Sequence, residues 1–312
     1  MEQIINLLPM TQARREAFLR AAEGCEQAFA ADAAALTAED YARATVILGN
    51  PPASALKNAR FLRLLQTRSA GVDRYLVPGV LPEGAALCSA VGAYGQSVSE
   101  HLFAMLLASM KRLPAYRDRQ RSGSWTDLGP VKTLVGATVL CVGTGDIGSA
   151  FARLCRAMGA RTLGVRRDPA KTAEGIDEMY GMDALDALLE RTDVVSLVLP
   201  HSAETLHLMD RSRLLRMKPD AILLNGGRGT AVDCAALAEV LEAGHLWGAC
   251  LDVTDPEPLP ADHPLWRQER AVLTPHTAGD DHLSVTADRI AEIALDNLAR
   301  YLAGRPLRNR VL

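Results

Sequence analysis

Three side chains suited to proton transfer and anion binding stand late in the chain, each just after a predicted strand. Arg228 lies in the string NGGRG, Glu257 in LDVTDPEPLP and His276 in TPHTAG. Histidine can give and take a proton near neutrality, and a neighbouring carboxylate favours its charged form. A guanidinium offers a fixed positive charge to a carboxylate or a developing oxyanion. Read alone, each is an ordinary surface or loop residue, but the joint placement of the three predicts a site. His101, at a predicted helix start, has no such company and is interpreted as structural.

A glycine-rich loop, GTGDIG at residues 143–148, stands between an apolar strand-like run and a helical pattern. In that context the GxGxxG spacing is typical of a dinucleotide-binding unit. The first glycine would allow the tight turn, the second would let a pyrophosphate approach the backbone, and the third would let the helix pack on the strand. The alternative is a turn with purely structural glycines. The cofactor residues expected here are Gly143, Gly145, Asp146, Ile147 and Gly148.

The end of the next predicted strand, roughly 20 residues beyond the glycines, usually contacts the ribose next to the adenine. Arg166 and Arg167 occupy this position. An acid there would bind the 2′-hydroxyl of NAD, whereas a guanidinium is suited to the 2′-phosphate of NADP. We therefore expect NADP(H) to be favoured. The alternative is a pair of solvated arginines with Asp168 as the ribose-binding acid, which would leave NAD(H) as the cofactor.

Short apolar runs alternate with segments of helical periodicity along the whole chain, which is typical of parallel sheets covered by helices on both faces. The early runs predict a smaller α/β unit, and six later runs predict a doubly wound dinucleotide-binding sheet. The predicted strands lie near residues 4–8, 44–48, 62–67 and 86–89, and then near 137–142, 162–165, 194–199, 221–225, 247–252 and 271–274.

A chain of 312 residues is long enough for two domains, and two helical segments suggest how they are divided. The amphipathic segment 97–121 contains Pro114, which should kink or break it. The run 284–302 is long enough to cross back to the first unit. We expect a doubly wound dinucleotide-binding domain inserted into a smaller, flavodoxin-like substrate domain. The predicted bounds are 1–97 with 285–312 for the substrate domain, and 98–284 for the dinucleotide-binding domain.

Taken together, the glycine loop and the three late strings resemble the D-isomer-specific 2-hydroxyacid dehydrogenase family. The likeness extends over nearly the whole chain. Further matching strings are SAGVD at 69–73, VSEH at 98–101, VVSLVLP at 194–200 and MKPD at 217–220. The resemblance implies an enzyme that reduces a small 2-keto acid to the D-2-hydroxy acid with NAD(P)H, in a cleft between two Rossmann-like domains.

The resemblance also implies a role for each matching residue. His276 would donate the proton, Glu257 would pair with it, and Arg228 would bind the substrate carboxylate and polarise the keto oxygen. Asp252 would bind the nicotinamide carboxamide. The remaining residues implied for cofactor binding are Leu199, Pro200, Thr205, Gly226, Arg228, His276 and Gly279. Those implied for substrate binding are Ser69, Ala70, Gly71, Arg228 and His276.

The sequence departs from the family pattern at several positions. Arg166 stands in place of an acid, Val198 in place of a common histidine, and Asp280 and Asp281 in place of small hydroxyl residues. NADP-preferring glyoxylate and hydroxypyruvate reductases resemble the chain best. The chain ends soon after His276, which disfavours an allosterically controlled phosphoglycerate dehydrogenase. A phosphoglycerate-type dehydrogenase without a regulatory domain stays as one alternative. Another is a non-catalytic protein that senses the redox state of a dinucleotide.

Composition narrows the partners and the compartment. A net charge of -3 disfavours a nucleic-acid partner, and neither a signal peptide nor a long apolar run is evident, so we expect a cytoplasmic protein away from membranes. The six cysteines lack metal-ligand spacing, and no metal is expected. The apolar run 102–110 and Trp125, together with the resemblance, predict a homodimer. The alternative is that both simply pack within the chain.

Overall fold

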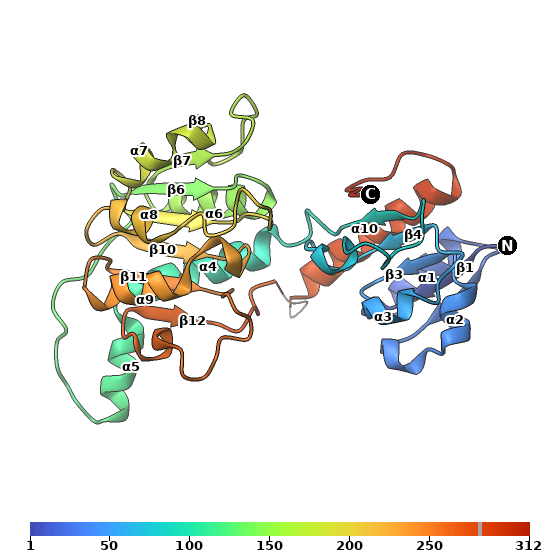
Figure 1. Ribbon diagram of the computed structural model, residues 1–312, viewed down its shortest axis with the longest axis horizontal. Helices are drawn as coiled ribbons and strands as arrows, with labels where there is room; N and C mark the ends of the chain where they lie inside the picture. The colour runs from blue at the N-terminus through green and yellow to red at the C-terminus, as the bar shows by residue number, and fades with distance from the viewer. Residues whose placement is uncertain (280–282) are drawn as a thin grey trace. The chain divides into compact units, whose positions relative to one another are not determined.

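Two parallel β-sheets carry the fold, one in each of two units of the chain (Figure 1). The computed structural model describes residues 1–279 and 283–312. The first unit comprises residues 1–93 and 281–312, and the second comprises residues 94–280. From the sequence we placed these boundaries at 97/98 and 284/285. The division of substrate and cofactor between the two units stays a prediction.

The first unit is built on a five-stranded sheet in the order β2-β1-β3-β4-β5, all parallel. This order is that of flavodoxin-like folds. Its strands are β1 (Gln3–Asn6), β2 (Glu26–Phe29), β3 (Val46–Leu48), β4 (Leu64–Gln66) and β5 (Ala86–Cys88). Its helices are α1 (Gln12–Ala21), α2 (Ala38–Arg43), α3 (Ala53–Leu56) and α10 (Ser284–Leu302).

Helix α10 has the bounds expected from the sequence and packs against α1 and β4. Asn297 Nδ2 on α10 donates hydrogen bonds to Gln66 Oε1 at 2.6 Å and to the carbonyl oxygen of Arg308 at 2.9 Å. Asn297 and Gln66 are both fully buried, so each must find such a partner. These bonds fix the C-terminal helix on the first unit.

The second unit is built on a seven-stranded parallel sheet in the order β12-β11-β10-β9-β6-β7-β8, which is a doubly wound sheet with one added strand. The predicted α/β class is therefore confirmed. Its strands are β6 (Thr138–Val142), β7 (Arg161–Val165), β8 (Glu178–Tyr180), β9 (Val194–Leu197), β10 (Ile222–Asn225), β11 (Gly248–Leu251) and β12 (Ala271–Leu273).

Two edge strands, one in each sheet, were not predicted from the sequence. The predicted count of six strands for the second sheet was therefore wrong, because the sheet has seven. Strands β2 and β8 are short, and half-buried or exposed residues make up each of them. An edge strand covered on few sides needs no continuous apolar run, which is the signal that identified the buried central strands.

Helices cover both faces of the second sheet. Alternate residues of its strands, such as Leu140 and Val142, form one core with α7, α8 and α9, while α4 packs on the opposite face beside α6. The helices are α4 (Gly95–Met110), α5 (Leu113–Arg121), α6 (Asp146–Ala157), α7 (Leu185–Leu189), α8 (Arg211–Arg216) and α9 (Cys234–Glu242). Short 3₁₀ turns lie at Ala33–Ala35, Asp73–Tyr75, Met182–Ala184, Gly229–Ala231 and Pro264–Arg267.

The predicted break in the segment 97–121 is present, but it precedes the proline. Helix α4 ends at Met110, and Arg112 adopts a left-handed φ of 55°. Pro114 then lies in the first turn of α5, where a missing backbone N–H costs nothing. Among the described helices, none is long and apolar enough to span a membrane.

Candidate active site

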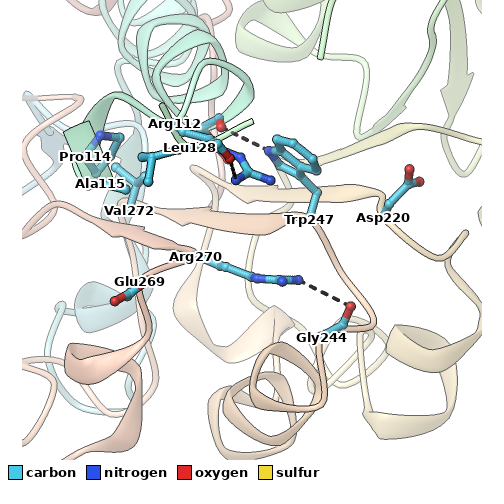
Figure 2. Close-up of a pocket in the computed structure, with 11 residues that line it drawn as sticks. Arg112, Pro114, Ala115, Leu128, Asp220, Gly244, Trp247, Glu269, Arg270 and Val272 are labelled. Carbon is cyan, nitrogen blue, oxygen red and sulfur yellow. Dashed lines mark hydrogen bonds between the residues drawn. The ribbon is translucent and has the colours of Figure 1, made fainter. Parts of the chain in front are cut away.

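Loops at the carboxyl edge of the second sheet carry most of the predicted site residues. In open parallel sheets this edge forms the ligand crevice, next to the point where the strand order reverses. That point lies between β6 and β9, which are neighbours in the sheet although they are distant in the chain. A hollow of about 390 Å³ (Figure 2) lies at the opposite edge of this sheet. Its lining residues Asp220, Trp247 and Arg270 come before β10, β11 and β12, whereas the predicted site residues follow their strands.

The three loop glycines differ in what surrounds them. A Cβ at Gly143, whose φ is 94°, would lie 2.3 Å from the carbonyl oxygen of Val198, and one at Gly148 would lie 2.0 Å from that of Gly143. Both positions therefore need glycine for the fold itself. Gly145 is exposed and would have nothing described within 4 Å of a Cβ. Its lack of a side chain leaves open space at the N-terminus of α6, which fits the pyrophosphate of a dinucleotide.

Arg166 and Arg167 follow directly after β7, as predicted. Arg166 donates a hydrogen bond to the carbonyl oxygen of Lys171 at 3.3 Å, which orients its guanidinium over its own loop. Asp168, the alternative ribose ligand, accepts a bond from the Ala170 N–H at 3.2 Å and lies 3.6 Å from Lys171 Nζ. Its carboxylate is therefore engaged within the turn.

The loop after β9, with the predicted residues Leu199, Pro200 and Thr205, lies within reach of the charge of Arg167. The pKa of Glu204 is held below its usual value, first by a hydrogen bond from Ser202 and also by the charge of Arg167. Thr205 donates its hydroxyl proton to the carbonyl oxygen of Pro200 at 2.8 Å. This hydrogen bond stabilises the conformation of the loop.

Glu257 and His276 meet at the ends of neighbouring strands. Glu257 lies in the loop after β11, His276 lies just after β12, and Glu257 Oε1 is 2.6 Å from His276 Nδ1. The two side chains are 44% and 49% exposed. A carboxylate at Nδ1 fixes the orientation of the ring and leaves Nε2 as the nitrogen for a substrate. The predicted pairing geometry is therefore present, while the catalytic role stays a prediction.

The backbone of His276 is left-handed, with a φ of 54°, a conformation that costs a residue with a side chain about 1 kcal/mol. Its N–H donates to the carbonyl oxygen of Asp252 at 2.8 Å. The carboxylate of Asp252 accepts bonds from the hydroxyl of Thr274 at 2.6 Å and from the N–H groups of Thr277 at 3.0 Å and Ala278 at 3.1 Å. Asp252, expected to bind nicotinamide, therefore also holds the histidine loop in shape.

Arg228 lies in a turn after β10 that Asn225 stabilises. The fully buried Asn225 donates from Nδ2 to the carbonyl oxygen of Arg228 at 2.9 Å and accepts from the Gly227 N–H at 3.1 Å. Arg228 Nη1 donates to the carbonyl oxygen of Gly227 at 3.0 Å. A Cβ at Gly229 would lie 1.8 Å from the carbonyl oxygen of Thr254, so the loops after β10 and β11 are in contact.

Of two further predicted cofactor residues, Gly226 is a packing position, because a Cβ there would lie 2.8 Å from Leu102 on α4. A Cβ at Gly279 would make only an ordinary contact, 3.4 Å from Val98 on the same helix. Asp280 and Asp281 lie outside the described residues. Thr274, in the string TPHTAG, was not singled out in the sequence, and His101 was interpreted as structural. In the structure His101 Nε2 lies 3.0 Å from Thr274 Oγ1.

The predicted substrate residues Ser69, Ala70 and Gly71 belong to the first unit and follow β4. Ser69 Oγ donates to the carbonyl oxygen of Gly71 at 2.6 Å, which tightens the turn. Within the described chain, the backbone N–H groups of Ala70 and Gly71 have no acceptor. Two adjacent N–H groups left over in this way can bind an anion.

Comparison with known proteins agrees with this geometry. Residues 103–278 match the family model for the D-isomer specific 2-hydroxyacid dehydrogenase, NAD binding domain. A glyoxylate/hydroxypyruvate reductase B of Enterobacter sp. (strain 638) is 33% identical over 88% of this chain and 86% of its own.

Solved structures extend the likeness to both units. A D-isomer specific 2-hydroxyacid dehydrogenase family protein from Aeromonas salmonicida is 33% identical, with a TM-score of 0.87 over 100% of this chain and 99% of its own. An NADPH-dependent glyoxylate/hydroxypyruvate reductase from Sinorhizobium meliloti, solved with NADP and sulfate, is 27% identical, with a TM-score of 0.80 over 100% of this chain and 98% of its own. The resemblance read from the motifs is thus confirmed. The chain belongs to the D-isomer specific 2-hydroxyacid dehydrogenase family and is an NAD(P)-dependent oxidoreductase.

Proposed function

We propose that the protein reduces a small 2-keto acid of the glyoxylate or hydroxypyruvate type to the D-2-hydroxy acid, with NADPH as the hydride donor. The single observation that carries this proposal is the 2.6 Å contact between His276 and Glu257 at the carboxyl edge of the dinucleotide-type sheet. The names of the Enterobacter and Sinorhizobium relatives support this substrate class.

His276 acts as the proton donor. NADPH, when bound, would supply the hydride for the carbonyl carbon, and His276 would give the proton on Nε2 of its imidazolium to the carbonyl oxygen. Glu257 keeps the ring oriented through Nδ1 and stabilises its charge until the proton leaves. Solvent returns a proton to His276 after each turnover, so one keto acid, one NADPH and one proton give one hydroxy acid and one NADP⁺.

Arg228 and the turn 69–71 bind the acid group. The guanidinium is always charged, and it can hold the substrate carboxylate while it polarises the keto oxygen. The N–H groups of Ala70 and Gly71 offer a second, uncharged anchor for the same carboxylate.

NADPH is favoured over NADH because of Arg166 and Arg167. Two guanidinium groups after β7 can pair with a 2′-phosphate, whereas the carboxylate of Asp168 is occupied by Lys171 and the Ala170 N–H. The Sinorhizobium relative was solved with NADP. Leu199, Pro200 and Thr205 would hold the adenosine side, Gly145 would make room for the pyrophosphate, and Asp252 would hold the nicotinamide.

We also propose that two copies associate through the segment 111–135, which follows α4. The apolar run 102–110, first expected at an interface, is largely buried inside the unit, but Trp125 is fully exposed and Val135 is 71% exposed. Two cations of this segment lie over one ring. The Arg112 guanidinium lies 4.7 Å from the ring centroid of Trp247 (Figure 2). Lys132 Nζ lies 5.1 Å from the same centroid. A firmly anchored segment with an exposed tryptophan is typical of a surface that a second copy covers.

The decisive experiment is steady-state kinetics with NADPH and NADH on glyoxylate, hydroxypyruvate, pyruvate and bulkier branched or aromatic keto acids. We expect the highest kcat/KM with NADPH and the two smallest polar acids. His276→Ala should abolish turnover and leave NADPH binding intact. If the purified protein turns over none of these acids but still binds NADPH, it is a dinucleotide sensor and the enzymatic proposal is wrong.

A further inference from the structure

A chain of hydrogen-bonding groups runs from α4 to the loop that carries His276. His101 Nε2 lies 3.0 Å from Thr274 Oγ1, which in turn lies 2.6 Å from Asp252 Oδ1. All three residues belong to the second unit. The side chains of His101 and Asp252 are 27% and 3% exposed, so water competes little for these bonds.

The chemistry of the three groups fixes the direction of the bonds. An ionised carboxylate only accepts, so Thr274 donates its single hydroxyl proton to Asp252. The lone pairs of the hydroxyl are then free to accept, and His101 must be the donor. A neutral His101 ring therefore carries its proton on Nε2. The same nitrogen lies 3.7 Å from Asp252 Oδ1, which is consistent with a donor at this position.

Thr274 and Asp252 hold the backbone on both sides of His276. Asp252 binds the N–H groups of His276, Thr277 and Ala278 through its carbonyl and carboxylate oxygens. The left-handed backbone of His276 persists only if such surroundings over-determine it. A displacement of the imidazole by about 1 Å can cost two orders of magnitude in rate, so the rigidity of this loop matters for proton transfer.

We propose that His101 is a positioning residue for the reaction, acting through Thr274 and Asp252 on the orientation of His276. This inference rests on the proposed function, in which His276 donates the proton. His101 itself contacts the hydroxyl and not the reacting atoms. The Nε2–H group of His101 holds the Thr274 side chain in one rotamer. In this rotamer the Thr274 hydroxyl donates its proton to Asp252.

The test compares His101→Leu, which removes the donor, with His101→Gln, whose side-chain N–H can reach Thr274 without any charge. We expect His101→Leu to lower kcat about fivefold and to leave KM for the keto acid and Kd for NADPH within about twofold, because only the transition state needs the exact ring position. His101→Gln should restore kcat to within about twofold of the wild type. The matched control is His245→Leu, since His245 Nε2 bonds to the carbonyl oxygen of Met217 at the opposite edge of the sheet.

A double-mutant cycle identifies the route. Thr274→Val should lower kcat by about tenfold or more, and adding His101→Leu to it should cost nothing further. Fully additive losses, an unchanged kcat in His101→Leu, or a loss that His101→Gln does not rescue would each overturn the inference. Retained turnover in His276→Ala would instead refute the proposed function, so the two failures are distinguishable.

Discussion

Glu257 and His276 contact each other across two adjacent loops, with Oε1 of the acid 2.6 Å from Nδ1 of the ring. Glu257→Gln keeps the size of the side chain but removes the charge that stabilises the imidazolium. We expect kcat for keto-acid reduction to fall about 100-fold, the usual scale of general acid catalysis. The dissociation constant for NADPH should change less than about twofold, because the substitution leaves the nucleotide loop intact.

The control for this prediction is Glu269→Gln, which changes a glutamate that precedes β12, at the other edge of the sheet. It should leave kcat unaltered. Equal kcat values for Glu257→Gln and the wild type would show that the carboxylate contributes nothing to the proton transfer.

The buried strands and the main site strings could be predicted from the sequence because their signals are local. Apolar runs identified the central strands, and α10 was predicted with the bounds it has in the structure. The edge strands β2 and β8 were not predictable, because their residues are half-buried or exposed and carry no apolar run. Pairing in a sheet, not composition, makes them strands.

The network behind His276 could not be predicted for a different reason. His101 and Thr274 are 173 positions apart in the chain and meet only when α4 packs against the end of β12. A lone histidine within a helix carries no signal of such a contact. Arg228, Glu257 and His276 were identified because each follows its own strand, so that a rule about strand ends applied to all three.

Gly145 and Gly148 should respond in opposite ways to an added methyl group. Gly145→Ala meets nothing described within 4 Å, so Tm should stay within about 2 °C of the wild type while KM for NADPH rises about tenfold or more. Gly148→Ala would place its Cβ 2.0 Å from the carbonyl oxygen of Gly143, and should lower Tm by several degrees. Thermal melting without cofactor separates the two. A Gly145→Ala variant with unchanged NADPH affinity would argue against a pyrophosphate at this helix end.

Arg166 and Arg167 should determine the choice between NADPH and NADH. In the double variant Arg166→Ala/Arg167→Ala we expect kcat/KM for NADPH to fall about 100-fold, since two charge-assisted contacts are lost, and that for NADH to change less than about threefold. The matched control is Asp168→Ala in the same loop, which should leave the NADPH/NADH ratio near the wild-type value. A wild-type enzyme that prefers NADH by a wide margin would contradict our interpretation of these arginines.

Trp125 should be needed for association but not for folding. Its side chain is fully exposed, so Trp125→Glu removes no packing within the chain and should leave Tm nearly unchanged at low protein concentration. In a two-fold interface the substitution would bury two like charges, and size-exclusion chromatography with light scattering should show a molar mass close to 33.5 kDa instead of twice that value. Trp266→Glu, at a 53% exposed tryptophan in the turn before β12, is the control and should remain dimeric. A wild-type protein that elutes as a monomer at all concentrations would contradict the dimer.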